Sequence, residues 1–575
     1  MSVKKNRLLF LLCLFLTSAC YSQQLLFTEL LSRPTASGVT IQLIFADSAQ
    51  VSVEYGTSSG VYPYQTAWQT FPDSTMATTA LTGLSADTKY YYRILYRKPG
   101  DTLNTVRPEY SFHTQRSVSS PFTFDIEADP HDDYNSDTAL YHQCLLNQLA
   151  DRPDFMIDLG DFLMTDKLQN TSGIVPYDTI PYRCRLFRKF YSVSGNSVPL
   201  FIAMGNHEGE AGWYLNGTAN SIPVWDAQVR KKYFLNPEPD SFYTGDTTNY
   251  PFIGKRQTYY AWQWGDALFI VLDPFWYTNP KPDSLNAWNW SLGSTQYNWL
   301  KQTLQNSNAT FKFVFSHQLV GGAGSGQGRG GTEPADFYEW GGENRDGTPG
   351  FATHRPGWYK PIKDLLTENH VNIFFHGHDH FFAKQQKDCL IYQETPQPSL
   401  HNFNYPAQAA QYGYDSGLIL SNSGHLRVTV SPIGTQVQYV RVYLPSDTNA
   451  THHNGDIAAT YFIGTQNCYD SINTGTPVLW NSNYFDEMVF PNPFTTETKI
   501  SFALDKTEAI NLAIFDEQGK LVRTLINGNV VSEGKYDVLW DGKYSYGADA
   551  RPGEYYYVLQ GEKTGRKTGK IVHMK

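Results

Sequence analysis

Five short apolar runs, each followed directly by polar side chains, constrain this chain more than any other feature. The runs are 122–128 (FTFDIEA), 154–159 (DFMIDL), 199–204 (PLFIAM), 311–315 (FKFVF) and 371–375 (VNIFF). Continuous apolar runs of this length, separated by helix-like stretches, are typical of strands in a sheet that is buried on both faces. Ligands of such sheets collect beyond the carboxyl ends of the strands. The sequence therefore predicts that the polar residues after the runs gather along one edge of one sheet.

The residues at the five run ends form a mixed set of oxygen and nitrogen ligands. They are Asp129 and His131, Asp161, Asn206 with His207, His317, and His378 with His380. Carboxylates, imidazoles and a carboxamide suit divalent transition metals, and no cysteine takes part. The set is too large for one tetrahedral metal, but it fits two metals that share a bridging carboxylate. We therefore expect a binuclear hydrolase, although Asp and Asn taken singly are also common as turn residues after strands.

In their order along the chain these residues resemble the calcineurin-like metallophosphoesterases, whose pattern runs Asp-x-His, Gly-Asp, Gly-Asn-His, His and Gly-His-x-His. The resemblance spans residues 118–445 and implies a four-layer αββα sandwich. It implies two sets of metal ligands, namely Asp129, His131, Asp161 and His380 for one metal, and Asp161, Asn206, His317 and His378 for the other. It also implies that Asp161 bridges the metals, that a bridging hydroxide attacks phosphorus, and that His207 acts as general acid.

One position separates this chain from the purple acid phosphatases, a related group. Those enzymes carry a tyrosine three residues after the aspartate of the second element, and this chain has Met164 there. A ferric-tyrosinate centre is therefore not expected. Zinc, manganese and iron(II), alone or in mixed pairs, all stay open because carboxylate and imidazole ligands do not choose among them.

Substrate contacts are expected from the glycine-rich segment 321–331 (GGAGSGQGRGG), which follows His317 closely. Its glycines allow backbone amides to approach an anion, and Arg329 within it could pair with phosphate oxygens. Arg355 is a weaker candidate for the same role. The alternative for the segment is a flexible, solvated loop.

Length and composition predict an exported protein of several domains. A chain of 575 residues suggests three or four domains, and 15% aromatic with 17% charged residues is closer to β-rich exported proteins than to helical cytosolic enzymes. The net charge of -10 argues against nucleic acid as a stable partner.

The N-terminus predicts export. Lys4, Lys5 and Arg7 precede an apolar stretch, 8–16, that is too short for a stable span, so we expect a signal peptide over residues 1–22, with a retained anchor as the alternative. No later run approaches the roughly 18 apolar residues of a transmembrane helix, so no membrane span is predicted. Four further cysteines, Cys144, Cys184, Cys389 and Cys468, allow three pairings in an exported chain.

The regions on either side of the catalytic segment are β-patterned and suggest two all-β, immunoglobulin-like sandwiches. Residues 25–115 resemble the fibronectin type III-like domain that precedes the catalytic domain of purple acid phosphatases, notably at 81–84 (LTGL) and 88–93 (TKYYYR). Residues 446–486 are rich in Asn, Asp, Thr and Gly, which predicts a linker. Residues 487–575 resemble C-terminal sorting domains of type IX secretion, of the kind similar to the flagellar-hook-capping fold, with 491–493 (PNP), 519–522 (GKLV) and 553–555 (GEY).

Together these features predict a secreted or cell-surface phosphatase that hydrolyses phosphate esters with two divalent transition metals. We expect the type IX secretion machinery to recognise this protein through its C-terminal domain. One alternative is a phosphodiesterase that acts on nucleotides or phospholipid headgroups. Another is a catalytically silent surface-binding protein that uses its two sandwiches to hold a polymer or a partner. The intact ligand set favours an enzyme.

Overall fold

The computed structural model describes residues 24–322, 328–403, 407–432, 434–465, 487–490, 492–504, 506–517, 520–544, 548–561, 563 and 565–574. The chain divides into two compact units, Met1–Ile463 and Gly464–Lys575. The predicted signal peptide and Cys468 lie outside the described residues. Among the helices of the described ranges, none is both long enough and apolar enough to cross a membrane.

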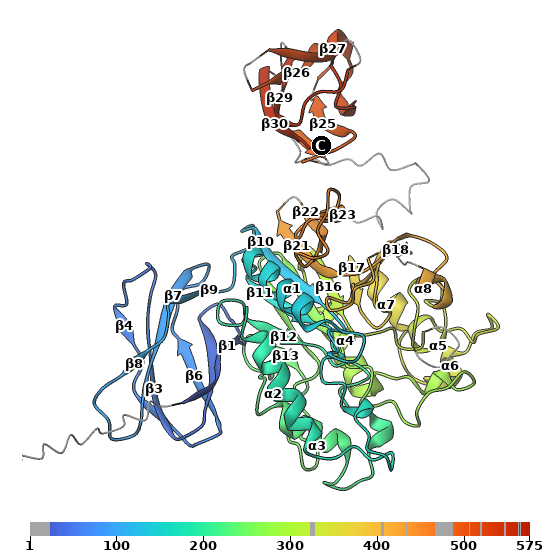
Figure 1. Cartoon of the computed structure of the whole chain (residues 1–575). Coiled ribbons are helices and arrows are strands. Elements are labelled where there is room, and N and C mark those ends of the chain that lie inside the picture. The colour runs from blue at the N-terminus through green and yellow to red at the C-terminus, as the bar shows by residue number, and fades with distance from the viewer. Residues whose placement is uncertain are drawn as a thin grey trace, which may run out of the picture. The chain divides into compact units, whose positions relative to one another are not determined.

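The first unit begins with two antiparallel sheets that share one core (Figure 1). The first sheet contains β1 (Leu25–Ser32), β2 (Gly38–Phe45) and β6 (Met76–Thr82). The second contains β3 (Ala49–Gly56), β4 (Tyr64–Gln65), β5 (Gln69–Phe71), β7 (Lys89–Arg97), β8 (Thr105–Val106) and β9 (Tyr110–His113). Along β7, Tyr90, Tyr92 and Ile94 are buried in the shared core, while the alternating residues face outward. This period of two is the strand pattern that the sequence predicts for the region.

These N-terminal sheets are fixed to the catalytic region through α2 (Thr179–Tyr191) and the residues that follow it. The Arg188 guanidinium donates to the backbone carbonyls of Thr28 and Gln42, at 2.7 and 3.1 Å. The Tyr92 hydroxyl donates to the Asn196 carbonyl at 2.7 Å. Because Arg188 is fully buried, this contact is part of the core, which is consistent with a scaffolding role for the N-terminal sheets.

The catalytic region is built on two further sheets that pack face to face through one aromatic-rich core. In the six-stranded sheet the order is β12 (Leu200–Ile202), β11 (Phe155–Asp158), β10 (Phe122–Glu127), β21 (Gly424–Ser431), β22 (Gly434–Arg441) and β23 (Ile457–Gly464). In the eight-stranded sheet it is β13 (Thr244–Gly245), β14 (Tyr260–Trp264), β15 (Ala267–Val271), β16 (Phe311–Phe315), β17 (Ile373–His376), β19 (Leu390–Glu394), β18 (Phe382–Lys387) and β20 (Leu418–Leu420). Strands β10, β11 and β12 are parallel to one another, as are β15, β16 and β17.

All five predicted runs form strands, but the prediction that they belong to one sheet is wrong. Three runs lie in the six-stranded sheet as β10, β11 and β12, and two lie in the eight-stranded sheet as β16 and β17. Each run is apolar because one face packs against the other sheet and the opposite face packs against helices. Phe124, for example, lies in the core between the sheets, whereas Met156 lies in the core shared with the helices. A run buried on both faces does not reveal which sheet it joins.

Helices cover the outer faces of both sheets and share a second core with them. They are α1 (Thr138–Asp151), α2, α3 (Ile222–Arg230), α4 (Gly293–Gln305), α5 (Tyr338–Gly341), α6 (Phe351–His354), α7 (Ile362–Glu368) and α8 (Ala407–Gln411), with three 3₁₀ turns, η1 (Thr165–Lys167), η2 (Gly212–Tyr214) and η3 (Ala287–Asn289). Helix α1 begins where the Asp137 carboxylate accepts from the Ala139 and Leu140 amides, and it ends at Arg152 in the left-handed conformation. An acidic N-cap of this kind satisfies amides that have no partner inside the helix.

The predicted linker, 446–486, contains regular structure in its first half. Strand β23 occupies Ile457–Gly464 and extends the six-stranded sheet beside β22. Residues 466–486 lie outside the described part of the chain. Cys144 and Cys184 are free and buried, and Cys389 is disulfide-bonded.

The second unit contains two antiparallel sheets around its own core. One sheet is formed by β24 (Glu487–Phe490), β25 (Thr498–Leu504) and β28 (Gly534–Trp540). The other is formed by β27 (Leu521–Val531), β26 (Glu508–Asp516), β29 (Gly553–Gly561) and β30 (Gly565–His573). Trp540 is fully buried in this core, so the unit has its own hydrophobic centre.

Candidate metal centre

The eight predicted residues all follow the carboxyl ends of strands from the two facing sheets. Asp129 and His131 follow β10, Asp161 follows β11, Asn206 and His207 follow β12, His317 follows β16, and His378 and His380 follow β17. Five of the eight have positive φ angles, between 50° and 79°, namely Asp129, His131, Asp161, His378 and His380. Backbone conformations of this kind are costly for residues other than glycine and occur mainly at functional sites.

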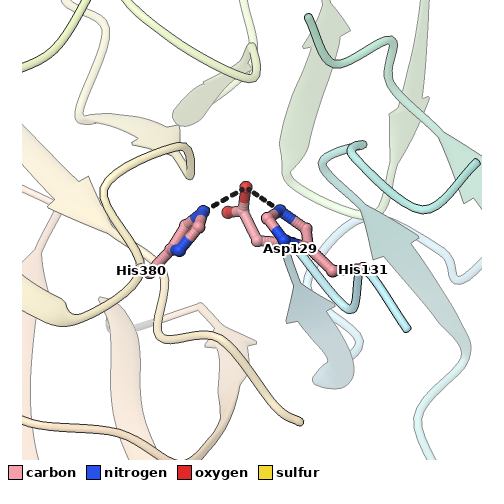
Figure 2. A group of neighbouring side chains, drawn as sticks. All are labelled: Asp129, His131 and His380. Carbon is pink, nitrogen blue, oxygen red and sulfur yellow. Dashed lines mark ion pairs between the residues drawn. The ribbon is translucent and has the colours of Figure 1, made fainter. Parts of the chain in front are cut away.

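The first group of ligand atoms belongs to Asp129, His131 and His380 (Figure 2). Asp129 lies between the two imidazoles, and its Oδ1 is 3.6 Å from His131 Nε2 and 3.4 Å from His380 Nε2. The other carboxylate oxygen, Oδ2, accepts a hydrogen bond from the His378 amide at 2.8 Å. This bond fixes the carboxylate so that Oδ1 faces the two histidines.

The second group belongs to Asp161, His317 and His378, with Asn206 beside it. His317 Nε2 lies 3.2 Å from Asp161 Oδ2, 3.2 Å from His378 Nδ1 and 2.9 Å from Asn206 Oδ1. The other ring nitrogen of His317 donates to the Leu159 carbonyl at 3.0 Å. A bond of this kind fixes the tautomer that leaves Nε2 free to bind a metal.

The two groups are adjacent and share Asp161. Its Oδ2 lies 3.2 Å from His317 Nε2 and 3.9 Å from His131 Nε2, so it faces both groups. Asp129 Oδ1, His131 Nε2 and Asp161 Oδ2 are all buried, and none has a hydrogen-bond partner among the described residues. Buried polar atoms without partners are costly, and two divalent cations would satisfy all three at once. The residues therefore fit a pair of metals with Asp161 in the bridging position.

The electrostatics of the centre also favour cations. Burial raises the pKa of Asp161, but His317 and His207 outweigh this effect and hold it below its usual range. Burial lowers the pKa of His317, and Asp161 and Asp129 then raise it to about 9. The carboxylates thus stay ionised and draw protons onto nearby histidines, which a metal would displace on binding. Burial lowers the pKa of His378 and His380, so these imidazoles are neutral and offer lone pairs.

Glu208, whose role the sequence did not predict, stabilises the loop that carries Asp161. Its buried carboxylate accepts from the amides of Asp161 at 2.9 Å, Phe162 at 2.8 Å and Leu163 at 3.2 Å, and also from the Gly205 amide. A Cβ atom at Gly205 would lie 2.2 Å from Asp161 Oδ1, so only glycine permits this approach. The Gly-Asn-His-Glu sequence therefore contributes Asn206 and His207 to the centre, and its glutamate stabilises the loop of Asp161.

His207 is oriented by a carboxylate that the sequence also did not indicate. Its Nδ1 lies 2.8 Å from Asp166 Oδ1, and the Tyr214 hydroxyl donates to Asp166 Oδ2 at 3.3 Å. The His207 amide donates to Asp161 Oδ1 at 2.7 Å, and its Nε2 lies 4.0 Å from Asp161 Oδ2. The ring therefore presents Nε2 to the metal centre while Asp166, in η1, holds the opposite nitrogen.

Arg329 lies against the loop that carries His378 and His380. It donates to the His378 carbonyl at 2.8 Å and to Asp379 Oδ1 at 2.9 Å, and its guanidinium stacks 4.0 Å from the centre of the Tyr412 ring. Asp379 Oδ2 accepts from the Tyr414 hydroxyl and the Gly330 amide, each at 2.8 Å. These contacts give Arg329 a role in holding the histidine loop. Residues 323–327 of the glycine-rich segment lie outside the described residues.

Arg355, the second predicted substrate contact, is engaged by a buried carboxylate and two backbone carbonyls. Its guanidinium pairs with the buried Glu339 and donates to the carbonyls of Trp288 and Trp290 at 2.7 and 2.8 Å. Because these bonds engage it in packing, the prediction that it contacts substrate gains no support. Met164, at the position of the purple tyrosine, is buried beside η1.

Comparisons with known proteins give the family and the fold of the catalytic region. Residues 122–382 match the model of the family described as calcineurin-like phosphoesterase, and residues 491–565 match that of the FlgD Ig-like domain. The solved structure of PhoD is similar with a TM-score of 0.55 and 14% identity, over 77% of this chain and 91% of PhoD. A purple acid phosphatase from seeds of yellow lupin (Lupinus luteus) is similar with a TM-score of 0.51 and 14% identity, over 76% of this chain and 74% of that enzyme. A search of curated proteins gave no match.

At 14% identity the structural likenesses establish the fold alone, and the family match adds the chemistry of residues 122–382. That match spans β10 to the start of β18 and includes all eight residues of the candidate centre. Two groups of side chains that could hold metal ions lie within the matched residues. The chain is therefore a metal-dependent phosphoester hydrolase built on a calcineurin-like metallophosphoesterase domain.

Proposed function

We propose that this protein is an exported phosphatase that hydrolyses phosphate esters at a centre of two divalent transition metals. The observation that carries the proposal is the pair of ligand groups joined by Asp161, with His207 beside them. One metal would be held by Asp129, His131, Asp161 and His380. The other would be held by Asp161, Asn206, His317 and His378. When bound, such a pair supplies Lewis acidity toward phosphate oxygens and lowers the pKa of water.

The protein's own residues supply orientation and proton transfer. Asp166 holds the Nδ1 side of His207, and Nε2 lies 3.0 Å from the Asn206 side-chain nitrogen, whose N–H donates to it. In the protonated ring Nε2 would be the atom that donates to the leaving-group oxygen. Glu208 and Arg329 hold the loops of Asp161 and His378 at fixed positions. The intact set of ligands and supports argues against a silent binding protein, since such a protein does not require either.

The proposal extends to architecture and location. We propose a four-layer αββα catalytic sandwich between two immunoglobulin-like domains, with a fibronectin type III-like domain at the N-terminal side. The match of residues 491–565 to the FlgD Ig-like domain supports a C-terminal domain of the type IX sorting kind. With the basic and apolar N-terminus of the sequence, this supports a secreted or cell-surface protein.

Metal analysis combined with a phosphate-ester panel tests this function. The metal-depleted protein is loaded separately with zinc, manganese or iron(II), and hydrolysis of p-nitrophenyl phosphate is compared with that of bis(p-nitrophenyl) phosphate. We expect about two metals per chain and a higher kcat/KM for the monoester. A higher value for the diester would favour the phosphodiesterase alternative, and a protein that binds metal but cleaves neither ester would contradict the proposal.

A further inference from the structure

A second cluster of ligand-type residues lies on the outer face of the six-stranded sheet, away from the catalytic centre. Asp125 of β10, Asp151 at the end of α1 and His425 of β21 each direct one ligand atom into this cluster, and these atoms lie within 4.8 Å of one another. Asp125 lies within β10, whereas Asp129 follows the end of that strand, and the cluster shares no residue with the two ligand groups of the catalytic centre. The cluster is therefore separate from the two ligand groups described above.

Asp125 is the member that needs an explanation. It is fully buried, and neither of its carboxylate oxygens has a hydrogen-bond partner within the described part of the chain. Glu127, the next residue on the same face of β10, is satisfied by the Tyr141 hydroxyl at 2.9 Å and by Gln148 at 2.7 Å. A buried carboxylate without donors is costly, whereas its neighbour on the same strand shows that this interface can supply them. Asp125 instead faces Asp151 and His425.

The other two members are held in place by groups on α1, β21 and β22. His425 Nε2 lies 2.9 Å from Asp151 Oδ2, and its Nδ1 lies 3.7 Å from the Cys144 thiol. Arg427 pairs with the second oxygen of Asp151 at 2.6 Å, and it is itself fixed by Gln438 at 3.0 and 2.9 Å. Asp151 is thus turned so that one oxygen points into the cluster.

Two carboxyl groups and an imidazole meet in this cluster, and Arg427 faces them from β21. Burial raises the pKa of Asp125 well above its usual range, so this carboxyl keeps a proton when no cation is bound. His425 is fully buried, and burial lowers its pKa, so its imidazole is neutral and can donate a lone pair. Asp151 also lies at the C-terminal end of α1, where the helix carbonyls carry partial negative charge.

We propose that Asp125, Asp151 and His425 bind a third divalent transition-metal ion, most simply zinc, that has a structural role. Two carboxylates and an imidazole are a ligand set that zinc accepts, at about 2.0–2.2 Å from each donor. Donors at that distance lie roughly 3–3.5 Å apart, so small side-chain rotations close the present spacing. The ion would join the end of α1 to β10 and β21, and it would supply the partner that Asp125 lacks.

The experiment uses the full-length protein with its catalytic metals removed by substitution. Asp161→Asn, His131→Ala and His317→Ala together provide this background, because each catalytic ligand group then lacks members. Zinc that stays bound after dialysis and gel filtration is counted by mass spectrometry. We expect about one zinc per chain in the background, no zinc after adding Asp125→Asn, and one zinc after adding Glu127→Gln. Glu127→Gln is the matched control because it neutralises a buried carboxylate on the same face of the same strand.

Thermal melting followed by circular dichroism gives an independent readout. Zinc should raise the melting temperature of the background and of the Glu127→Gln variant, but not that of the Asp125→Asn variant. His425→Gln serves as a second ligand variant if Asp125→Asn does not fold. A folded background that binds no zinc, or an Asp125→Asn variant that keeps it, would overturn the proposal and would identify Asp125 as a buried neutral acid. Neither result depends on hydrolytic activity.

Discussion

Replacement of His207 by alanine tests whether this side chain delivers a proton to the leaving group. In the structure Asp166 engages Nδ1 of His207 at 2.8 Å, and Nε2 faces the metal centre 4.0 Å from Asp161 Oδ2. A carboxylate that is hydrogen-bonded to an imidazole fixes the orientation of the ring. Nε2 is therefore placed to donate the proton, and the alanine variant removes the donor while leaving the ligand side chains in place.

The expected loss depends on the leaving group. General acid catalysis by a positioned histidine contributes about 10²–10⁴-fold, which corresponds to roughly 3–5 kcal/mol of transition-state stabilisation. A poor leaving group, such as phenolate or an alkoxide, requires that proton and should show the full loss. The p-nitrophenolate ion leaves without a proton, so its ester should lose about tenfold or less. Asp166→Asn keeps a hydrogen-bond acceptor beside His207 but removes the charge, which should cost about tenfold.

The assay is kcat/KM for a series of aryl phosphates whose leaving groups span a wide range of pKa. The kcat/KM of the His207→Ala variant should depend more steeply on leaving-group pKa than the kcat/KM of the wild type. In a double-mutant cycle, Asp166→Asn should have little further effect once His207 is alanine, because the carboxylate acts through the imidazole. An equal loss across the series would refute proton donation, and an undiminished effect of Asp166→Asn in the alanine background would refute the orienting role.

Three other predictions follow from the centre and its supports. Asp161→Ala and His317→Ala should each lower bound catalytic metal by at least one equivalent and reduce hydrolysis to background; unchanged metal content would contradict the ligand assignment. Asp379→Asn weakens the Arg329 contact, so it should lower metal affinity about tenfold and leave kcat at saturating metal nearly unchanged, whereas a lower kcat alone would place Arg329 on substrate. Burial raises the pKa of Glu127 to about 7 from 4.5, so the folded state prefers the protonated acid and stability falls by up to about 3 kcal/mol as pH rises from 4.5 through 7. Glu127→Gln should flatten this fall in urea unfolding curves recorded across that range, and an unchanged pH dependence would show that another group causes it.

The strands that carry the ligands could be predicted because their signal is local. Each is a continuous apolar run, such as 311–315, that ends directly before a polar residue, and all five runs form strands. The order of ligand types after these runs identifies the chemistry in the same local way. The partition of the strands between two sheets could not be predicted in this way, because it depends on which face of each run meets the other sheet. Phe124 and Phe269, for example, come from different sheets and meet at 5.0 Å between ring centres, a contact between residues far apart in the sequence.

The supports around the metals could not be predicted for a related reason. Asp166, Glu208 and Asp379 are polar residues beside recognisable motifs, and nothing in their own sequence context separates them from solvated turn residues. Their roles arise only when the loops after different strands come together, so that Asp166 meets His207 and Glu208 meets the amides of the Asp161 loop. Burial then turns each from an ordinary carboxylate into a group that must be paired. The same reasoning separates Asp125 from its neighbours, because it is equally buried but has no donor among the described residues. The physical requirement that buried polar groups be compensated therefore indicates both the supports of the candidate centre and the proposed third metal site.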